Sequence, residues 1–310
     1  MDFKMNKLLK KMMVVLLSLG LVQAVWADDV LDFKETLQAA DQGNAKAQFY
    51  LGGMYYKGEG VRQDYKQAVQ WYRKAAEQGV AEAQYNLGVM YAQGQGVHQD
   101  DTQAVQWYRK AAEQGDAEAQ LNLGMMYLNG QGVRQDDAQA AGWFLKAAEQ
   151  GDVNAQYNLG LMYDNGLGFR QDDAQAVQWY RRAAEQGYAG AQVNLGLMYE
   201  QGQGVRQDYA QAVQWYRRAA EQGNADAQVN LGVMYANGQG VRQDYTQAVQ
   251  WCRRAAEQGH AGAQFNLGVM YAEGRGVRQD LALAQEWFGK ACQNGDQDGC
   301  DIYQRLKAGY

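Results

Sequence analysis

The feature that most constrains this chain is an internal repeat. A unit of 36 residues recurs seven times with no insertion between copies. A unit of this length cannot bury its apolar side chains alone and does so only against its neighbours. The pattern therefore predicts one continuous solenoid and not two globular domains. The seven units span residues 45–80, 81–116, 117–152, 153–188, 189–224, 225–260 and 261–296.

Each unit predicts two helices. In the first unit apolar residues recur at helical spacing over residues 45–57 and again over 65–78, on either side of the segment GEGVRQD. Gly58 suits the left-handed residue that ends a helix. Asp64 followed by Gln67 has the spacing of a capping box, in which each residue's side chain binds the other's backbone N–H. We call the two predicted helices of each unit helix A and helix B, and the predicted fold class is all-α.

Two further expectations concern contacts within the unit. Gly52 and its equivalents fall inside helix A, where glycine costs about 1 kcal/mol relative to alanine. Close approach of helix B explains this cost, and we expect Trp71 to fill the space beside the glycine. Glu77 follows Arg73 by four residues, which is the spacing of an ion pair on a solvated helix face.

The repeated residues resemble a known family. The pattern A-x-A-Q-x-x-L-G-x-M-Y-x-x-G-x-G-V-x-Q-D-x-x-x-A-x-x-W-x-x-x-A-A-x-Q-G is similar to the Sel1-like repeat, a relative of the tetratricopeptide repeat with a longer loop. The resemblance covers residues 45–296. It implies an α/α right-handed superhelical solenoid with helix A on the concave face. It also implies an adaptor or scaffold, since exported bacterial members are often linked to envelope biology or host contact.

The terminal segments differ from the repeats. Residues 1–27 combine four lysines, a short apolar run and small residues before Ala27, which is the pattern of a cleaved signal peptide. We therefore expect cleavage after Ala27, export to the periplasm or beyond, and no stable membrane insertion afterwards. Residues 28–44 are expected to form an N-terminal capping helix, and residues 297–310 a C-terminal one.

Composition argues against several function classes. Without residues 1–27, acidic residues exceed basic ones by about nine, and the two signs alternate, so we expect no nucleic-acid partner. The only serine is Ser18, within the predicted signal, so no serine triad can form. The two histidines, His98 and His260, occupy different positions in their units and are interpreted as solvated substitutions. No metal site and no cofactor are expected.

The cysteines suggest one crosslink. Cys292 and Cys300 flank the turn before the last predicted helix, and their spacing resembles the Helicobacter cysteine-rich branch of the family. That resemblance implies a disulfide that staples adjacent helices. The alternative is two unrelated buried thiols. Cys252 replaces a tyrosine and is interpreted as a small buried apolar residue.

Helix A positions that packing does not need form the candidate binding surface. One position is asparagine in six units, and the position three residues later is aliphatic. We call the first set the asparagine ladder: Asn86, Asn122, Asn158, Asn194, Asn230 and Asn266. We call the second set the aliphatic row: Val89, Met125, Leu161, Leu197, Val233 and Val269.

The ladder has two explanations. In one, each amide bonds a neighbouring helix end and sets the register between units. In the other, the amides bind the backbone of an extended peptide while the aliphatic row accepts its side chains. The resemblance supports the second, because clamp-type tetratricopeptide domains hold peptides with an asparagine two residues before the equivalent glycine. The lysines of that clamp are absent here. Apolar residues of repeats three and four, such as Leu145, indicate either an exposed patch or sequence drift.

The leading hypothesis is a non-enzymatic, exported scaffold that binds a protein or peptide on the concave helix A surface. A hydrolase acting on cell-wall or β-lactam substrates is the alternative, suggested only by the cysteine-rich relatives. A structural envelope component that binds through its outer faces or ends is the third.

Overall fold

The computed structural model describes residues 32–308, and this part of the chain consists of α-helices, turns and loops. The predicted all-α solenoid of helix pairs is confirmed. The helices A are α3 (Ala45–Lys57), α5 (Ala81–Gln93), α7 (Ala117–Asn129), α9 (Val153–Asn165), α11 (Ala189–Gln201), α13 (Ala225–Asn237) and α15 (Ala261–Glu273). The helices B are α4 (Tyr65–Glu77), α6 (Asp101–Glu113), α8 (Asp137–Glu149), α10 (Asp173–Glu185), α12 (Tyr209–Glu221), α14 (Tyr245–Glu257) and α16 (Leu281–Gln293). The array is flanked by α2 (Phe33–Asp41) and α17 (Gln297–Lys307).

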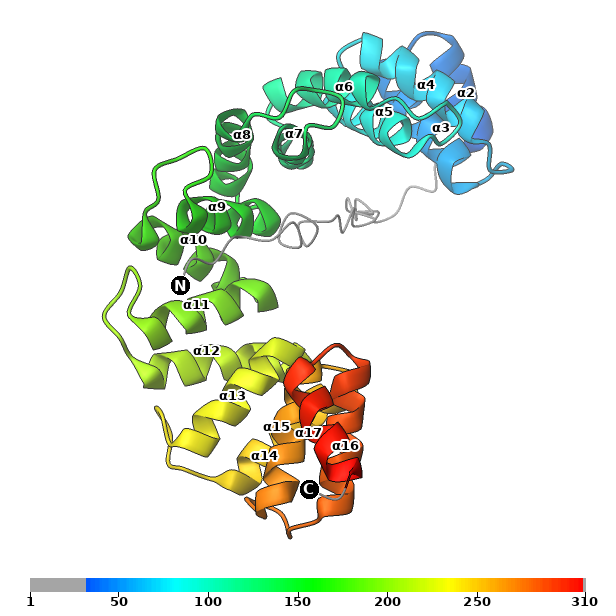
Figure 1. Ribbon diagram of the computed structural model, residues 1–310. Coiled ribbons are helices and arrows are strands. Elements are labelled where there is room, and N and C mark those ends of the chain that lie inside the picture. Colours follow the sequence, from blue (N-terminus) through cyan, green and yellow to red (C-terminus); the bar gives the residue numbers. More distant parts are fainter. Residues whose placement is uncertain (1–31, 309–310) are drawn as a thin grey trace.

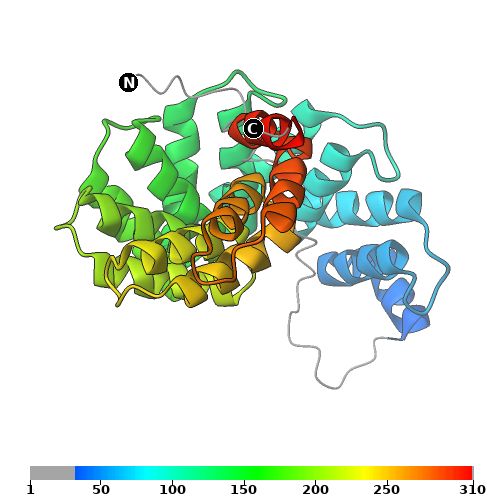
Figure 2. The same cartoon turned by 60° about the horizontal axis from the view of Figure 1, so that its bottom comes forward.

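The helix pairs stack one after another along an arc. Each helix A packs on the helix B of its own unit and on the helix B of the unit before. In Figure 1, α5 and α7 lie on the inner side of the arc and α6 and α8 on its outer side. Figure 2 shows the curvature from a second direction, with α17 at the end of the stack. Helix A therefore supplies the inner surface, as the family resemblance implied.

The helix ends follow the local sequence signals. Gly58 ends α3 in the left-handed conformation (φ 77°), and the Asp64 side chain accepts from the backbone N–H of Gln67. The second half of the predicted capping box is wrong. The backbone N–H of Asp64 donates to the carbonyl of Tyr55 at 2.9 Å, so it does not need the Gln67 side chain. This bond ties the end of each loop back to its helix A.

The residue that faces the helix A glycine is a tyrosine and not the predicted tryptophan. A Cβ atom built on Gly52 would lie 2.6 Å from Cδ1 of Tyr72, so only glycine lets the ring pack there. Trp71, one residue earlier, instead joins Ala40 and Leu51 in the core between successive helix pairs. Adjacent helix B residues thus lie in different cores. Tyr72 contacts Gly52 of its own unit and packs with Leu87 of the next, whereas Trp71 packs with Leu51 of its own unit and Ala40 of the preceding helix.

A glycine of the loop explains the fixed length of the unit. A Cβ atom on Gly96 would lie 2.3 Å from the backbone oxygen of Tyr65, the first residue of the preceding helix B. Gly96 also has a positive φ of 71°. Each loop therefore crosses closely over the start of the previous helix B. An insertion in the loop would disturb this contact, which accounts for seven units without one.

The ends of the array carry the two flanking helices. The predicted signal segment 1–27 lies outside the described residues, and within 32–308 no helix is long and apolar enough to cross a bilayer. Helix α2 packs on α3, and α17 packs on α16. A disulfide joins Cys292 to Cys300 with their Cα atoms 4.4 Å apart, and it staples α16 to α17. Closing so short a loop stabilises the end of the array by roughly 2–3 kcal/mol.

Candidate binding surface

The asparagine ladder lies on the inner helices and is mostly half-buried. Asn158 is the exception, with 8% of its surface exposed, and its Nδ2 lies 3.7 Å from the sulfur of Met125. Asn194 bonds the hydroxyls of Tyr157 and Tyr180. Within residues 32–308 the remaining ladder amides have no hydrogen-bond partner: Asn86, Asn122, Asn230 and Asn266. Half-buried amides with unused donors and acceptors can bind the backbone of a ligand.

The aliphatic row runs beside the ladder. All six side chains are half-buried, so each presents part of its surface to solvent beside an asparagine. Several of them also contact the cores between repeats, where Met125 packs with Leu159 and Leu197 with Leu231. These side chains therefore pack into the core on one side and face solvent on the other, which is what subsites for the side chains of an extended peptide require.

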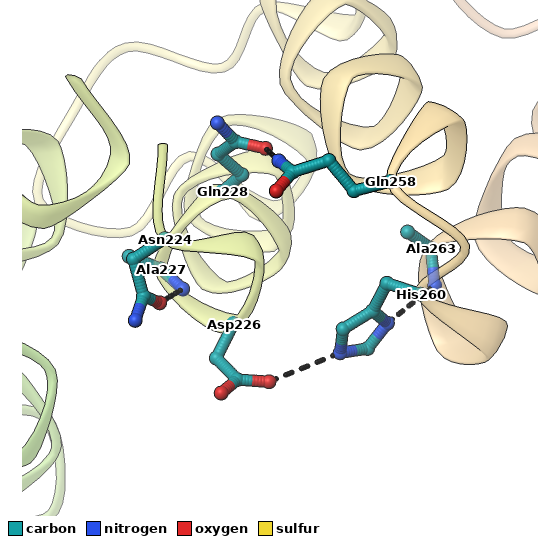
Figure 3. Close-up of polar contacts among 7 residues, drawn as sticks. All are labelled: Asn224, Asp226, Ala227, Gln228, Gln258, His260 and Ala263. Atoms are coloured by element: carbon teal, nitrogen blue, oxygen red, sulfur yellow. Dashed lines mark hydrogen bonds and ion pairs between the residues drawn. The ribbon is translucent and has the colours of Figure 1, made fainter. Parts of the chain in front are cut away.

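Register between repeats is set by glutamines that the sequence interpretation missed. Gln228, buried at 3% exposure, donates from Nε2 to the carbonyl of Ala220 at 3.1 Å and accepts from Gln258 Nε2 at 2.8 Å (Figure 3). The same arrangement recurs at Gln48, Gln84, Gln120, Gln156, Gln192 and Gln264, with Asn294 as the donor in the last unit. No ladder asparagine bonds a helix end within the described chain. The structural explanation for the ladder is therefore unsupported, because glutamine performs that role.

The doubled basic residues of helix B also have partners that were not expected. The predicted ion pair between Arg73 and Glu77 is absent from the described chain, and Arg73 instead bonds the hydroxyl of Tyr91 in the next helix A. Equivalent arginine–tyrosine bonds recur at four later junctions at 2.5–2.7 Å. The second basic residue lies over the ring of the tryptophan three residues earlier, as Lys74 does over Trp71 at 3.7 Å. The first cation therefore links successive repeats, and the second covers a tryptophan of its own helix.

One junction departs from this arrangement. In repeat three Leu145 replaces the bridging arginine, and in repeat four Tyr163 stacks on Phe169 with ring centroids 4.4 Å apart. Leu145 and Leu167 are half-buried against the same core. The proposed exposed apolar patch is thus wrong, because these side chains fill the junction from which the arginine is missing.

His260 has a structural role that the sequence did not reveal. Its Nδ1 accepts from the backbone N–H of Ala263 at 3.1 Å, which caps α15, and its Nε2 lies 3.1 Å from Oδ1 of Asp226 on α13 (Figure 3). The hydrogen bond to Asp226 raises the pKa of His260, while burial opposes it. The same bond lowers the pKa of Asp226. The interpretation of His260 as a merely solvated substitution is wrong, whereas His98 is exposed.

Cys252 and possible metal ligands are the remaining candidates for chemistry. Cys252 is fully buried against Gly232, and burial raises the pKa of its thiol to about 12, so it is a packing residue as predicted. Within the described residues, no group of three or more His, Cys, Asp or Glu side chains could hold a metal ion. The inner helices α5 to α15 carry amides, aliphatic side chains and carboxylates.

Comparison with known proteins agrees with this architecture. The family model of the Sel1 repeat matches all seven units, over residues 45–80, 81–116, 117–152, 153–188, 189–224, 225–260 and 261–296. The chain belongs to the Sel1 repeat family. A Sel1 repeat array is a scaffold that typically mediates protein–protein interaction, and the predicted membership is confirmed.

Two solved structures resemble this Sel1 repeat protein along most of its length. One is a protective antigen of uropathogenic Escherichia coli strains, with 42% identity and a TM-score of 0.84 over 89% of this chain and 59% of that one. The other is a Sel1 repeat protein from Oxalobacter formigenes, with 39% identity and a TM-score of 0.73 over 88% of this chain and 79% of that one. This chain thus spans less than two thirds of the E. coli protein. No match was found among curated proteins.

Proposed function

We propose that this Sel1 repeat protein is an exported, non-enzymatic scaffold that binds an extended segment of a protein or peptide on its inner helix A surface. The observation that carries the proposal is the set of unpartnered ladder amides. Polar groups that are withdrawn from water normally find partners in the protein or in ordered water, and half-buried amides keep donors and acceptors that a ligand can reach. Four of the ladder amides have no partner within the described residues, and they lie beside a half-open aliphatic row on the same helices.

Export rests on two supporting features. The N-terminal pattern is that of a signal peptide, and disulfides such as Cys292–Cys300 persist in oxidising compartments such as the periplasm. Envelope biology or host contact is the proposed setting. The E. coli relative is a protective antigen, and a surface-accessible array would fit such a setting here too.

The test compares inner and outer amides. The triple variant Asn86→Ala, Asn122→Ala and Asn230→Ala removes three unpartnered ladder amides. The control triple variant Gln106→Ala, Gln178→Ala and Gln250→Ala removes three exposed amides from helices B. Each protein is immobilised and used to capture partners from an envelope extract, after circular dichroism has shown equal folding.

The ladder variant should lose the partners that the wild type retains, and the control should keep them. Equal capture by the two variants would refute the groove. The hydrolase alternative predicts turnover of a chromogenic β-lactam such as nitrocefin that survives repurification. No feature of the described residues favours that activity, and such turnover would refute the non-enzymatic proposal.

A further inference from the structure

The charges of the inner helices have one sign. From α5 to α15 every helix A carries a single charged residue, and in each case it is acidic: Glu82, Glu118, Asp164, Glu200, Asp226 and Glu273. Beyond the first repeat, the lysines and arginines of the array lie on helices B and loops. The inner surface is therefore uniformly acidic while the outer surface mixes both signs.

Four of these six carboxylates have a hydrogen-bond or ionic partner on a helix B, at a helix cap or in a loop. Asp164 and Glu200 accept from the hydroxyls of Tyr180 and Tyr216, at 3.2 and 2.6 Å. Asp226 binds His260, and Glu273 lies 2.7 Å from Nε of Arg275. Glu82 and Glu118, in repeats two and three, have no cationic partner within the described chain.

The repeat geometry places further carboxylates beside Glu82 and Glu118. Asp226 and His260 meet at 3.1 Å across a junction, and the equivalent positions at earlier junctions are Glu82 with Asp116 and Glu118 with Asp152. At the junction of repeats six and seven a histidine faces the carboxylate. At the junctions of repeats two and three and of repeats three and four a second carboxylate takes the place of the histidine. Burial raises the pKa of Glu118, a hydrogen bond from Tyr85 opposes it, and the charges of Asp116 and Asp152 add to the rise. Burial and the charge of Glu82 raise the pKa of Asp116 as well.

A buried donor on the same repeats also lacks a partner. The hydroxyl of Tyr108, on a side chain 1% exposed, has no hydrogen bond, and the Tyr108 ring lies 5.9 Å from that of Tyr85, which bonds Glu118. The equivalent tyrosines direct their hydroxyls at the inner helix, so that of Tyr108 points towards Ala92 and the row residue Val89. This unused donor is buried beneath the inner face and is not itself open to a ligand.

We propose that the inner face of repeats two to four binds a lysine- or arginine-bearing stretch of an extended peptide. This inference rests on the proposed function and adds the chemistry of the partner. The cationic groups meet Glu82, Glu118 and their neighbouring aspartates, as His260 meets Asp226. The aliphatic stems of lysine and arginine lie along the row residues, since such stems cover apolar surface while the charge stays at a polar group. Charge complementarity of this kind fixes the register of a bound segment.

The experiment uses the full-length protein and three fluorescent octapeptides, acetylated and amidated, of alternating Lys-Val, Gln-Val or Glu-Val. Binding is followed by fluorescence anisotropy at low salt. The variant Glu82→Gln/Glu118→Gln removes two inner charges. The control Glu113→Gln/Glu149→Gln removes two exposed charges from helices B of the same repeats, so both variants have the same net charge.

The wild type should bind the Lys-Val peptide at least about tenfold more tightly than the Gln-Val peptide, because each close charge pair strengthens binding. The inner variant should lose this preference and the control should keep it. Equal affinity for the Lys-Val and Gln-Val peptides, or equal loss in both variants, would overturn the inference. If binding of the Gln-Val peptide still depends on the ladder, the proposed function survives that result. If no peptide responds to the ladder variant, the proposed function fails as well.

The chain's own N-terminal lysines could compete only before the expected cleavage after Ala27. The full chain and the chain without residues 1–27 should therefore bind the Lys-Val peptide equally, and both should distinguish it from the Gln-Val peptide. A preference for Lys-Val that is at least tenfold larger without residues 1–27 would assign the surface to the chain's own segment and overturn the proposal of an external partner.

Discussion

The unpartnered hydroxyl of Tyr108 leads to a prediction about stability. In repeat five the equivalent hydroxyl, on Tyr216, donates to Glu200 Oε2 at 2.6 Å. Repeat two has Ala92 at the position of Glu200, so Tyr108 has no acceptor. The substitution Ala92→Glu should supply one from the backbone position that already works in repeat five.

The expected gain follows from two opposing contributions. A buried donor left unsatisfied costs about 1–3 kcal/mol, and a hydrogen bond to a charged group contributes about 1.5–3 kcal/mol. Ordering the glutamate side chain costs up to about 2 kcal/mol, and its helix propensity is slightly below that of alanine. We expect Ala92→Glu to stabilise the protein by about 1 kcal/mol. For a chain of this size that corresponds to a rise in Tm of about 2–4 °C.

The chain contains a matched control. Ala236 is the same position in repeat six, where Cys252 replaces the tyrosine and offers no hydroxyl. Ala236→Glu should therefore give no gain. Tyr108→Phe should cost little in the wild type, because Phe144 fills the equivalent space in repeat three, and it should abolish the gain from Ala92→Glu.

Thermal and urea unfolding followed by circular dichroism measure these effects. A gain from Ala92→Glu that persists in the Tyr108→Phe background would refute the reasoning, since the hydroxyl could not be its source. An equal gain from Ala236→Glu would refute it as well, because it would then arise from added charge or helix propensity.

Two further predictions test the packing and the junctions. Gly160→Ala should destabilise the protein by about 1–3 kcal/mol, because its Cβ would lie 2.4 Å from the buried ring of Tyr180. Gly142→Ala has nothing within 4 Å of its Cβ and should stabilise the protein by up to about 1 kcal/mol. Equal effects of the two substitutions in urea unfolding would contradict this. The contact of His260 with Asp226 should stabilise the folded protein most at pH values between the two pKa values. The contribution of His260 is lost as pH rises through its raised pKa, and the contribution of Asp226 is lost as pH falls through its lowered pKa. His260→Asn keeps an N-cap at every pH, whereas protonation of Nδ1 removes the cap that His260 gives Ala263. Because the pKa of His260 is nevertheless raised, the ionic contribution is the larger, and the Tm difference from wild type should shrink from about pH 6 to about pH 8. A difference independent of pH would contradict the ionic contribution.

Local signals explain why the helices could be predicted from the sequence. The start of α3 at Ala45 and its end before Gly58 depend on residues within a few positions, and the aspartate caps of helix B are equally local. Repetition strengthened each signal, because one observation recurred in every unit. The half of the capping box that failed depended on Tyr55, nine residues before Asp64, which supplies the competing carbonyl.

Contacts between elements were harder to predict because helical spacing permits several partners. Trp71 and Tyr72 are adjacent and both apolar, so periodicity cannot decide which one faces Gly52, and the angle between the helices does. Arg73 has the spacing to pair with Glu77, but Tyr91 from the next repeat competes for it. The structure shows which partner is closer, and the sequence of one unit does not.

The buried glutamines show a signal that was present and not used. Gln48 recurs in every unit within an apolar stripe, and a polar residue repeated at a buried position requires a partner. Gln78 recurs with it in all but the last unit, where asparagine takes its place. Two polar positions that recur together predict a bond between them, and the structure contains it within the unit at 2.7 Å. The bond to the neighbouring unit runs from the same glutamine position to a helix B carbonyl, as from Gln84 to Ala76 at 3.0 Å.

Once register is assigned to the glutamines, the variable positions of helix A gain a different significance. Residues that hold the stack are nearly the same in every unit, so they cannot distinguish one partner from another. The second residue of helix A changes along the array, from Glu82 and Glu118 to Gly190 and then Asp226 with its histidine. At this position a bound segment would therefore meet a carboxylate without a cationic partner only in the N-terminal half of the array. This asymmetry gives an otherwise repetitive groove a direction, and a partner with its basic residues at one end would bind in a single orientation.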